Sequence, residues 1–390
     1  MSSMVIAAVA ACLAVIPALV FLHNLRLYTT PPADPPPSGE TRVSVLIPAR
    51  NDERTIHATV MAALASKDVT VEVIVLDEHS SDQTARIVAT LAKHDPRLRL
   101  LAAPQLPPGR YGTTHACAAL ARAAQYPILL FLDANVRLAP RGVLRMVHAL
   151  NRNHADLASG FPREDTETLM EQLVVPLTHF LLLGFLPLWR RHTGRHPAYG
   201  AGCGHQMVIA RRDAYERAGG HSAISAPLHD GITLPRAFQA AGLRTDLFDA
   251  TDLAHCRMYH SAAEVWRGFA QNAHQGLARP VLILPATVLL GGGQIVPFVL
   301  LTHALWGPAD PVVFGLGLLG SAAAYVPRLI GVRRFRQSWT GALLHPCGVF
   351  IVLLIQWYAL IRRALCPPAA WKGRASLSAV AARPSGNVKR

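Results

Sequence analysis

The sequence has few cysteines, and none of them is placed as metal-binding or redox cysteines are. Six cysteines are scattered over 390 residues, and no two form a C-x-x-C pair. This spacing argues against a zinc ribbon, a thioredoxin-like motif and a disulfide framework. The central part of the chain is therefore compatible with a reducing compartment.

Acidic residues are also scarce. The chain has 24 Asp and Glu against 38 Lys and Arg, which gives a net charge of +14. Such an excess can bind nucleic acid, but the sequence has no helix-turn-helix or zinc-finger spacing and no basic stripe interleaved with aromatics. Many arginines instead lie beside apolar runs, as in proteins that contact the anionic cytoplasmic leaflet. We therefore predict a membrane partner and no nucleic-acid polymer.

Apolar runs lie at both ends of the chain, in which 51% of all residues are hydrophobic. Residues 4–22 carry no charge and are long enough to cross a bilayer. A cleaved signal peptide is the alternative, but the run has no positively charged start. We predict an anchor at 1–27, a Pro-rich linker at 28–41 and a cytoplasmic domain at 42–279, followed by a transmembrane region at 280–363 and a basic tail at 364–390.

The C-terminal topology is ambiguous. Candidate spans are 281–306, 311–330 and 341–361, and the basic loop 328–336 predicts that this loop faces the cytoplasm. Three spans would then place the basic tail outside, against the charge rule. Either one segment is re-entrant or the rule fails here. A further apolar segment, 173–189, is expected to be an interfacial helix or a buried core helix.

The central domain alternates strands and helices. Compact apolar runs at 42–47, 71–77, 98–102 and 127–133 are separated by helical segments at 54–66, 84–93 and 114–124. This order predicts an α/β fold of βαβ units, with a mostly parallel sheet covered by helices on both faces. Ligands bind such sheets beyond the carboxyl ends of the strands.

Polar residues stand where three of these strands end. They are Arg50 after Pro48-Ala49, then Asp77, and then Asp133-Ala134-Asn135. Together they predict a polar crevice at one edge of the sheet. Ser81 or Asp82, followed by Gln83-Thr84-Ala85, has a simpler interpretation as a helix N-cap.

In their order, these segments resemble family 2 glycosyltransferases, which have the GT-A fold and use nucleotide-activated sugars. The resemblance runs from about 42 to 276. It implies that Asp77 binds the nucleotide base and that Pro48, Ala49 and Arg50 border the same pocket. Asp133 opens the D-x-D position, where Asp133 and Asn135 would hold Mn²⁺ or Mg²⁺ on the donor diphosphate. The cation would stabilise charge that develops on the leaving nucleoside diphosphate.

Two positions depart from the family pattern. Asn135 replaces an anionic ligand with an amide, and Thr113 stands where the family often has Lys. An amide oxygen still coordinates hard cations, although with less charge. The chain could accordingly bind metal weakly, dispense with it, or be an inactive relative.

Further resemblance implies a donor and acceptor region. Gly202, Gly204 and His205 would lie under the donor sugar, and His229 precedes Asp230, which matches the family's general base. An inverting transfer needs a carboxylate that takes the proton of the attacking hydroxyl. The alternative for Asp230 is a helix cap.

The segment before the C-terminal spans contains Trp266 and Arg267 but not the Q-x-x-R-W sequence of processive synthases. It looks more like the branch that glycosylates carotenoid, hopanoid or other lipid acceptors. Trp266 could border an acceptor channel or belong to the core of an interfacial helix. We predict an inverting transferase at the cell membrane that moves one sugar from a nucleotide donor, a UDP-hexose, to a lipid or isoprenoid acceptor. The alternatives are a processive polysaccharide synthase and a degenerate nucleotide- or lipid-binding relative.

Overall fold

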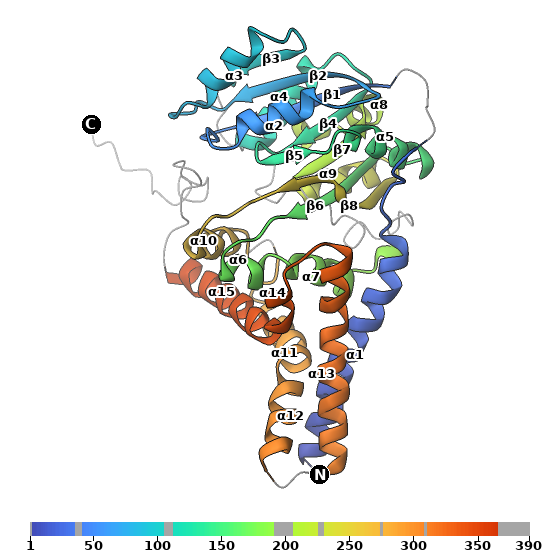
Figure 1. Cartoon of the computed structure of the whole chain (residues 1–390), viewed down its shortest axis with the longest axis vertical. Helices are drawn as coiled ribbons and strands as arrows, with labels where there is room; N and C mark the ends of the chain where they lie inside the picture. The colour runs from blue at the N-terminus through green and yellow to red at the C-terminus, as the bar shows by residue number, and fades with distance from the viewer. Residues whose placement is uncertain are drawn as a thin grey trace, which may run out of the picture.

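The computed structural model describes residues 2–35, 41–104, 112–190, 206–224, 230–273, 276–307 and 310–365. An eight-stranded sheet in the order β3-β2-β1-β4-β7-β6-β8-β5 forms its upper part in Figure 1. The strands are β1 (Arg42–Ala49), β2 (Thr70–Asp77), β3 (Leu98–Ala102), β4 (Ile128–Leu132), β5 (Val136–Leu138), β6 (Leu157–Glu164), β7 (Met207–Arg211) and β8 (Thr245–Cys256).

The α/β fold predicted from the alternating pattern is confirmed, and the sheet is mixed. The β1·β2, β1·β4, β2·β3 and β6·β8 pairs are parallel, whereas β4·β7, β6·β7 and β5·β8 are antiparallel. The four strands expected from the sequence form the parallel half. Because β7 is antiparallel to both β4 and β6, β4 and β6 run in the same direction, and their carboxyl ends share one edge.

Helices cover both faces of the sheet, as the near-continuous apolar strands require. On one face, α2 (Ile56–Leu64), α3 (Thr84–Ala92) and α5 (Gly142–Arg152) bury their apolar sides against the strands. On the other, α4 (Gly112–Ala123), α8 (Arg212–Arg217) and α9 (Asp230–Ala240) do the same. The sheet is therefore the middle layer of three.

A collar of helices lies beneath the sheet in Figure 1. Its members are α6 (Leu169–Val174), α7 (Leu177–Phe185), α10 (Ala262–Asn272), α14 (Trp339–Leu343) and α15 (His345–Leu365). The apolar segment predicted at 173–189 contains the last two residues of α6 and the whole of α7. Leu173, Val174 and Phe180 are buried against side chains of α10, α11 and α15. Of the two alternatives left open by the sequence, the buried core helix describes this segment.

Three long rods form a stalk below the collar: α1 (Ser2–Leu27), α11 (Ile283–Gln294) continuing into α12 (Val296–Trp306), and α13 (Pro311–Arg334). Each rod is long and apolar enough to cross a membrane, as is α15. The rods pack closely through small residues. A Cβ on Gly293 would stand 2.4 Å from the carbonyl oxygen of Leu13, and one on Gly320 would stand 2.9 Å from Pro297. Close backbone approach of this kind is typical of helices that associate in lipid.

The last predicted span, 341–361, is not one straight helix along the stalk. It is divided between the short α14 and α15, and α15 lies across the foot of the sheet-bearing part in Figure 1. It packs against α6, α10 and α11. Its orientation therefore differs from that of the three rods.

Arginines join the stalk to the sheet. Arg334 donates to the buried Asp249 of β8 at 3.0 Å, and Arg336 pairs with Asp252 at 2.6 Å. Arg328 is buried within the collar, where its guanidinium donates to the carbonyl oxygens of Pro176 and Gly341. The basic residues that suggested a lipid-facing loop are in part structural cross-links between the two halves of the molecule.

Candidate active site

The loops that follow β1 and β2 are bonded to each other at the carboxyl edge of the sheet. Ala49 and Asp77 are directly paired across the two strands. Beyond them, the Asn51 amide donates to Ser80 Oγ at 3.0 Å and the Ser81 amide donates to Asn51 Oδ1 at 2.8 Å. Asn51 adopts the left-handed conformation (φ 53°), which asparagine tolerates. These bonds fix the segment that carries Arg50 beside the end of β2.

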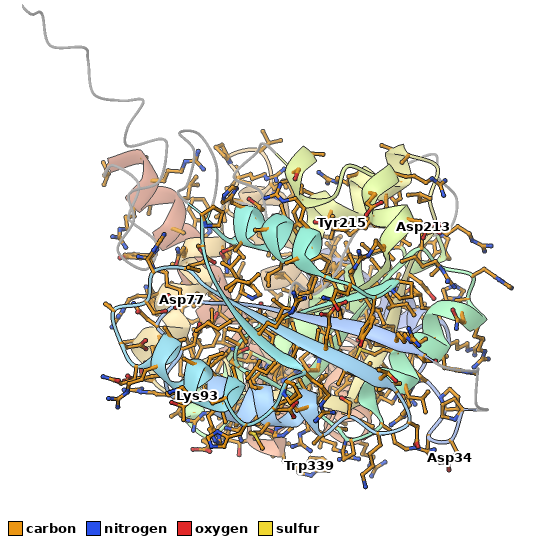
Figure 2. All side chains as sticks on the ribbon, turned by 90° about the horizontal axis from the view of Figure 1, so that it is seen from above. Asp34, Asp77, Lys93, Asp213, Tyr215 and Trp339 are labelled. Atoms are coloured by element: carbon orange, nitrogen blue, oxygen red, sulfur yellow. The ribbon has the colours of Figure 1, made fainter. Side chains whose placement is uncertain are left out.

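Asp77 lies at the end of β2, where Figure 2 labels it on the side of the sheet away from Asp213. Its carboxylate accepts from the Ser80 amide at 3.2 Å. Asp82, farther along the loop, accepts the Thr84 amide at 2.9 Å, next to the start of α3. Burial opposes ionisation of Asp82, but the bonds from Thr84 and Glu53 lower its pKa overall. The N-cap position of α3 is occupied by Gln83, so Asp82 binds the first helical residue without being the N-cap residue itself.

The Asp133-Ala134-Asn135 segment is clamped from both sides as it leaves β4. The Asp133 amide donates to the carbonyl oxygen of Gln206 at 2.9 Å, and Thr59 Oγ1 donates to the carbonyl oxygen of Ala134 at 2.8 Å. Gln206 immediately precedes β7, and Thr59 belongs to α2. Both hydrogen bonds together hold the segment between β7 and α2 at the carboxyl end of β4.

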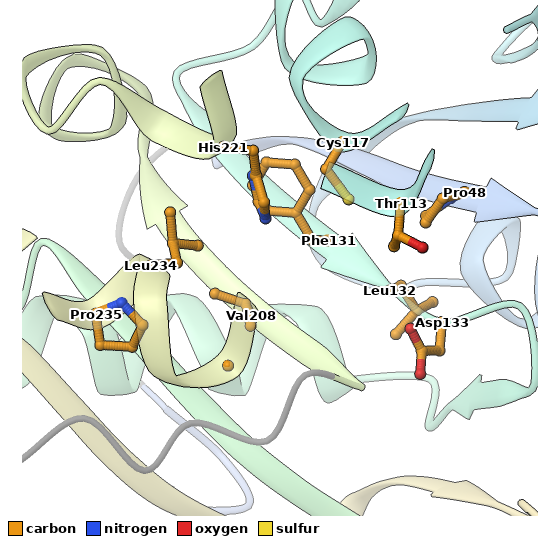
Figure 3. A pocket seen from close by; sticks show the side chains of 11 residues that line it. Pro48, Thr113, Cys117, Phe131, Leu132, Asp133, Val208, His221, Leu234 and Pro235 are labelled. Atoms are coloured by element: carbon orange, nitrogen blue, oxygen red, sulfur yellow. The ribbon is translucent and has the colours of Figure 1, made fainter. Parts of the chain in front are cut away.

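A pocket opens next to this segment (Figure 3). Pro48, Thr113 and Asp133 lie on one side of it, and His221, Phe131 and Leu234 lie on the other. Its full lining is Pro48, Thr113, Cys117, Phe131, Leu132, Asp133, Val208, His221, Gly231, Leu234 and Pro235. The structure thus brings together two residues of the predicted nucleotide site, Pro48 and Asp133, whereas Ala49, Arg50 and Asp77 are outside this lining.

His221 forms a wall of the pocket that the sequence did not single out. Its ring meets Phe131 edge-on with centroids 4.8 Å apart, and its Nδ1 lies 2.9 Å from the Tyr215 hydroxyl. Gly220 permits this arrangement, because it has a φ of 50° and a Cβ there would stand 2.4 Å from the Tyr215 ring. In the sequence, only the pair Gly219-Gly220 before His221 indicated a tight turn here.

Buried oxygens without hydrogen-bond partners lie near Asp133. Among the described residues these include Asn135 Oδ1 and Glu164 Oε2. Burial raises the pKa of Glu164 to about 7, with the Gln206 hydrogen bond acting in the opposite direction. Oxygens left in this state are suited to a hard cation. Within the described part of the chain no three His, Cys, Asp or Glu side chains gather closely enough to hold a metal, so a cation here needs the amide oxygen and donor phosphates as well.

Glu164 was missed because β6 contains Gly160 and Pro162, which weaken the strand pattern. The rule that found Asp77 and Asp133, a carboxylate at the end of a strand, applies to Glu164 too. Cys256, next to it on β8, is not a nucleophile, since burial and then the carboxylates of Glu164, Asp133 and Asp165 raise the pKa of its thiol well above 9.0.

Several predicted residues fall elsewhere. Gly202, Gly204, His205 and His229 lie outside the described residues. Asp230 is the first residue of α9, its side chain is likewise outside the description, and the next residue, Gly231, lines the pocket.

Trp266 and Arg267 lie on α10 in the collar. Trp266 meets Tyr358 of α15 edge-on at 5.5 Å, and Arg267 is exposed. Trp266 is thus a partly buried residue of the collar.

Comparison with known proteins agrees with this geometry. Residues 44–197 match the model of glycosyl transferase family 2. A 4,4'-diaponeurosporenoate glycosyltransferase of Staphylococcus haemolyticus is 25% identical over 230 residues, which is 57% of this chain and 59% of that protein. Its counterpart in Staphylococcus aureus strain USA300 is 23% identical over 300 residues, 75% of this chain and 72% of that protein.

Among solved structures, a mannosyltransferase of Pyrobaculum calidifontis in complex with GDP-Man and Mn²⁺ has a TM-score of 0.50 at 18% identity. The alignment covers 93% of this chain and 99% of the mannosyltransferase chain. At this identity the likeness concerns the fold, which is GT-A.

The fold is thus that of the GT-A class, and the family-model match over residues 44–197 indicates a glycosyltransferase. Within residues 44–197 the chain is similar to family 2 glycosyltransferases, and over a longer stretch it is similar to the 4,4'-diaponeurosporenoate glycosyltransferases. The alignment spans about three fifths of the first of these relatives.

Proposed function

We propose that the protein is an inverting glycosyltransferase that moves one sugar from a nucleotide donor, a UDP-hexose, to a lipid or isoprenoid acceptor. The observation that carries this proposal is the pocket between Asp133 and the start of α9, which lies at the carboxyl edge of a family 2 sheet. Relatives named for 4,4'-diaponeurosporenoate support an isoprenoid acceptor.

The donor would lie along the ends of β1, β2 and β4. Asp77, beside Ala49, would accept hydrogen bonds from the base, and the Pro48-Ala49-Arg50 backbone would border it. Asp133 and Asn135 would hold Mn²⁺ or Mg²⁺. When bound, the cation would stabilise the charge of the departing diphosphate. Thr113, in the pocket, offers a hydroxyl where a lysine would offer a charge.

The acceptor would react from the side of α9. An acceptor hydroxyl would attack the anomeric carbon, the bond from that carbon to the diphosphate oxygen would break, and the proton would pass to Asp230. The position of Gly231 in the pocket lining supports this role for its neighbour. An acceptor carboxylate would need no base, so dependence on Asp230 distinguishes the two acceptor types.

Membrane attachment follows from the stalk and collar. Four helices are apolar and long enough to cross a bilayer. We propose a multi-pass protein of the cell membrane with the sheet on the cytoplasmic side. An acceptor dissolved in the bilayer would then reach the pocket without leaving lipid.

The test is release of nucleoside diphosphate from a panel of nucleotide sugars by the full chain in nanodiscs, with and without lipid extract and Mn²⁺. Asp133→Asn and Asp230→Asn are compared with Asp213→Asn, a variant of an exposed α8 residue that is not part of the pocket lining. We expect lipid-dependent release by the wild type and Asp213→Asn, and a loss of about 100-fold or more in Asp133→Asn.

The result of the Asp230→Asn variant separates the mechanisms. Full turnover in this variant with a hydroxyl acceptor would contradict the proposed base. Silence of the folded wild type with every donor would favour a binding protein that has lost activity through Asn135 and Thr113. A ladder of long products would indicate a processive synthase.

A further inference from the structure

Glu164 ends β6 at the edge of the sheet where Asp133 follows β4. Its strand runs in the same direction as β4, because β7 lies between them and is antiparallel to both. Across the sheet, Glu164 is opposite Cys256, and Cys256 is opposite Val136, the residue after Asn135. Glu164 therefore shares a row of the sheet with Val136, the residue that follows the D-x-D segment, although it lies about thirty positions farther along the chain.

Gln206 connects the two. Its side-chain amide donates to Glu164 Oε1 at 3.2 Å, and its carbonyl oxygen accepts the Asp133 amide at 2.9 Å. A single residue thus touches the Glu164 carboxylate and the backbone of the first D-x-D residue. The arrangement resembles the supporting contacts that orient groups around metals.

The second oxygen of Glu164 has no partner. Oε2 is buried without a hydrogen bond among the described residues, and the same is true of Asn135 Oδ1. The arginines on the same strand ends contact other acids: Arg163 donates to Asp165 at 2.9 Å and Arg257 donates to Glu171 at 3.1 Å. A buried carboxylate that lacks compensation is costly, and a bound cation removes that cost.

From these contacts we infer that Glu164 supplies the negative charge that Asn135 lacks, and that Asp133, Asn135 and Glu164 together bind the divalent cation. In this arrangement the second carboxylate of the site comes from β6 instead of from the D-x-D segment. The inference rests on the proposed function, which requires a cation at the donor diphosphate. It explains how a chain with Asp-Ala-Asn can retain metal affinity.

The experiment measures Mn²⁺ binding to the full chain in nanodiscs, with UDP present, by the electron paramagnetic resonance signal of free Mn²⁺. We expect Glu164→Gln, which keeps the length of the side chain, to weaken binding by about tenfold or more. Adding Asn135→Asp to Glu164→Gln moves the charge within the site and should restore most of the affinity. Glu167→Gln, an exposed glutamate three positions along, is the matched control and should bind like the wild type.

Three results would overturn the inference. Glu164→Gln could bind Mn²⁺ as Glu167→Gln does, or the double variant could stay weak while its thermal unfolding matches the wild type. The wild type could also bind no Mn²⁺ with UDP. In that last case, metal-free release of UDP from a UDP-sugar would leave the proposed transferase intact while the cation site fails.

Discussion

At the scale of single residues, the carboxyl edge of the sheet holds acids in different electrostatic states. Asp82 accepts two bonds from Thr84 and has a lowered pKa, whereas burial raises the pKa of Glu164 to about 7. Asp82 binds the backbone at the start of α3, whereas Oε2 of Glu164 is buried without a hydrogen-bond partner among the described residues. Perturbed groups of the second kind cluster at functional sites.

Glu171 provides a test of pH dependence at this scale. It accepts hydrogen bonds from Arg257 at 3.1 Å and Thr168 at 2.6 Å, and so ties α6 to the end of β8. Although burial opposes ionisation, these bonds lower the pKa of Glu171 below 4.5. Because the pKa is lower in the folded state, this stabilisation is present above about pH 4.5 and is lost as the pH falls through the folded pKa.

We therefore expect the unfolding temperature of the wild type to fall more between pH 6 and pH 4 than that of Glu171→Gln, which lacks the contribution at both pH values. Tryptophan fluorescence during heating in detergent measures the difference. Glu216→Gln, at an exposed position of α8, should behave like the wild type. Equal slopes for Glu171→Gln and the wild type would contradict the role of this ion pair.

At the scale of elements, the stalk is held by close backbone contacts between helices. In lipid, apolar side chains gain little by leaving their surroundings, so tight packing at small residues has to hold the rods together. Gly293 of α11 lies against the backbone of Leu13 in α1, whereas Gly315 of α13 has nothing within 4 Å of the position of a Cβ. The two glycines differ in their surroundings but both lie in helices.

The matched substitutions should have opposite effects. Gly293→Ala forces α1 and α11 apart and should destabilise the protein by about 1–3 kcal/mol. Gly315→Ala meets open space and removes a flexible residue from a helix, so it should be neutral or stabilising by about 1 kcal/mol or less. Thermal unfolding in the same detergent measures both, and equal loss in the two variants would refute the close contact at Gly293.

At the scale of the whole molecule, the membrane topology depends on whether α15 crosses the bilayer. Its exposed apolar side chains recur every three or four residues, which places them on one face of the helix: Phe350, Leu354, Tyr358, Ile361 and Leu365. The opposite face is buried against the collar, and two arginines, Arg362 and Arg363, stand in the last turn. We therefore expect α15 to lie in the membrane interface, although it is long and apolar enough to cross a bilayer.

If α15 lies in the interface, both of its ends are on the side of the sheet. The conflict between three C-terminal spans and the basic charge beyond them then disappears, since only α11–α12 and α13 cross after the catalytic domain. This placement accords with the re-entrant alternative more closely than with a failure of the charge rule.

Cysteine labelling tests this topology in a cysteine-free background. Leu365→Cys at the end of α15 is compared with Asp213→Cys in the sheet-bearing part and Trp306→Cys at the far tip of the stalk. All three positions are exposed. With an impermeant maleimide, we expect Leu365→Cys to label with Asp213→Cys in inverted vesicles and Trp306→Cys to label in intact cells. Labelling of Leu365→Cys together with Trp306→Cys would show that α15 crosses the membrane.

The sequence by itself determined the parts that local pattern encodes. The β-strand periodicity at β1 to β4, the acids at Asp77 and Asp133, and the apolar lengths of the stalk helices can all be recognised within short windows, because strand pattern and membrane length are local properties. The bonds from Asp82 to Thr84 also lie within such a window, although the N-cap position itself is Gln83.

Only the tertiary structure decided which distant residues meet. Glu164 lies beside the D-x-D segment because β6 and β8 enter the same sheet, and His221 lies over Phe131 because the turn at Gly220 folds back onto Tyr215. The orientation of α15 depends on the other collar helices, which cover one of its faces. The number of apolar residues in its sequence does not show that these helices pack there. Contacts between residues far apart in the chain depend on the packing of whole elements, and neither hydrophobic period nor spacing specifies that packing.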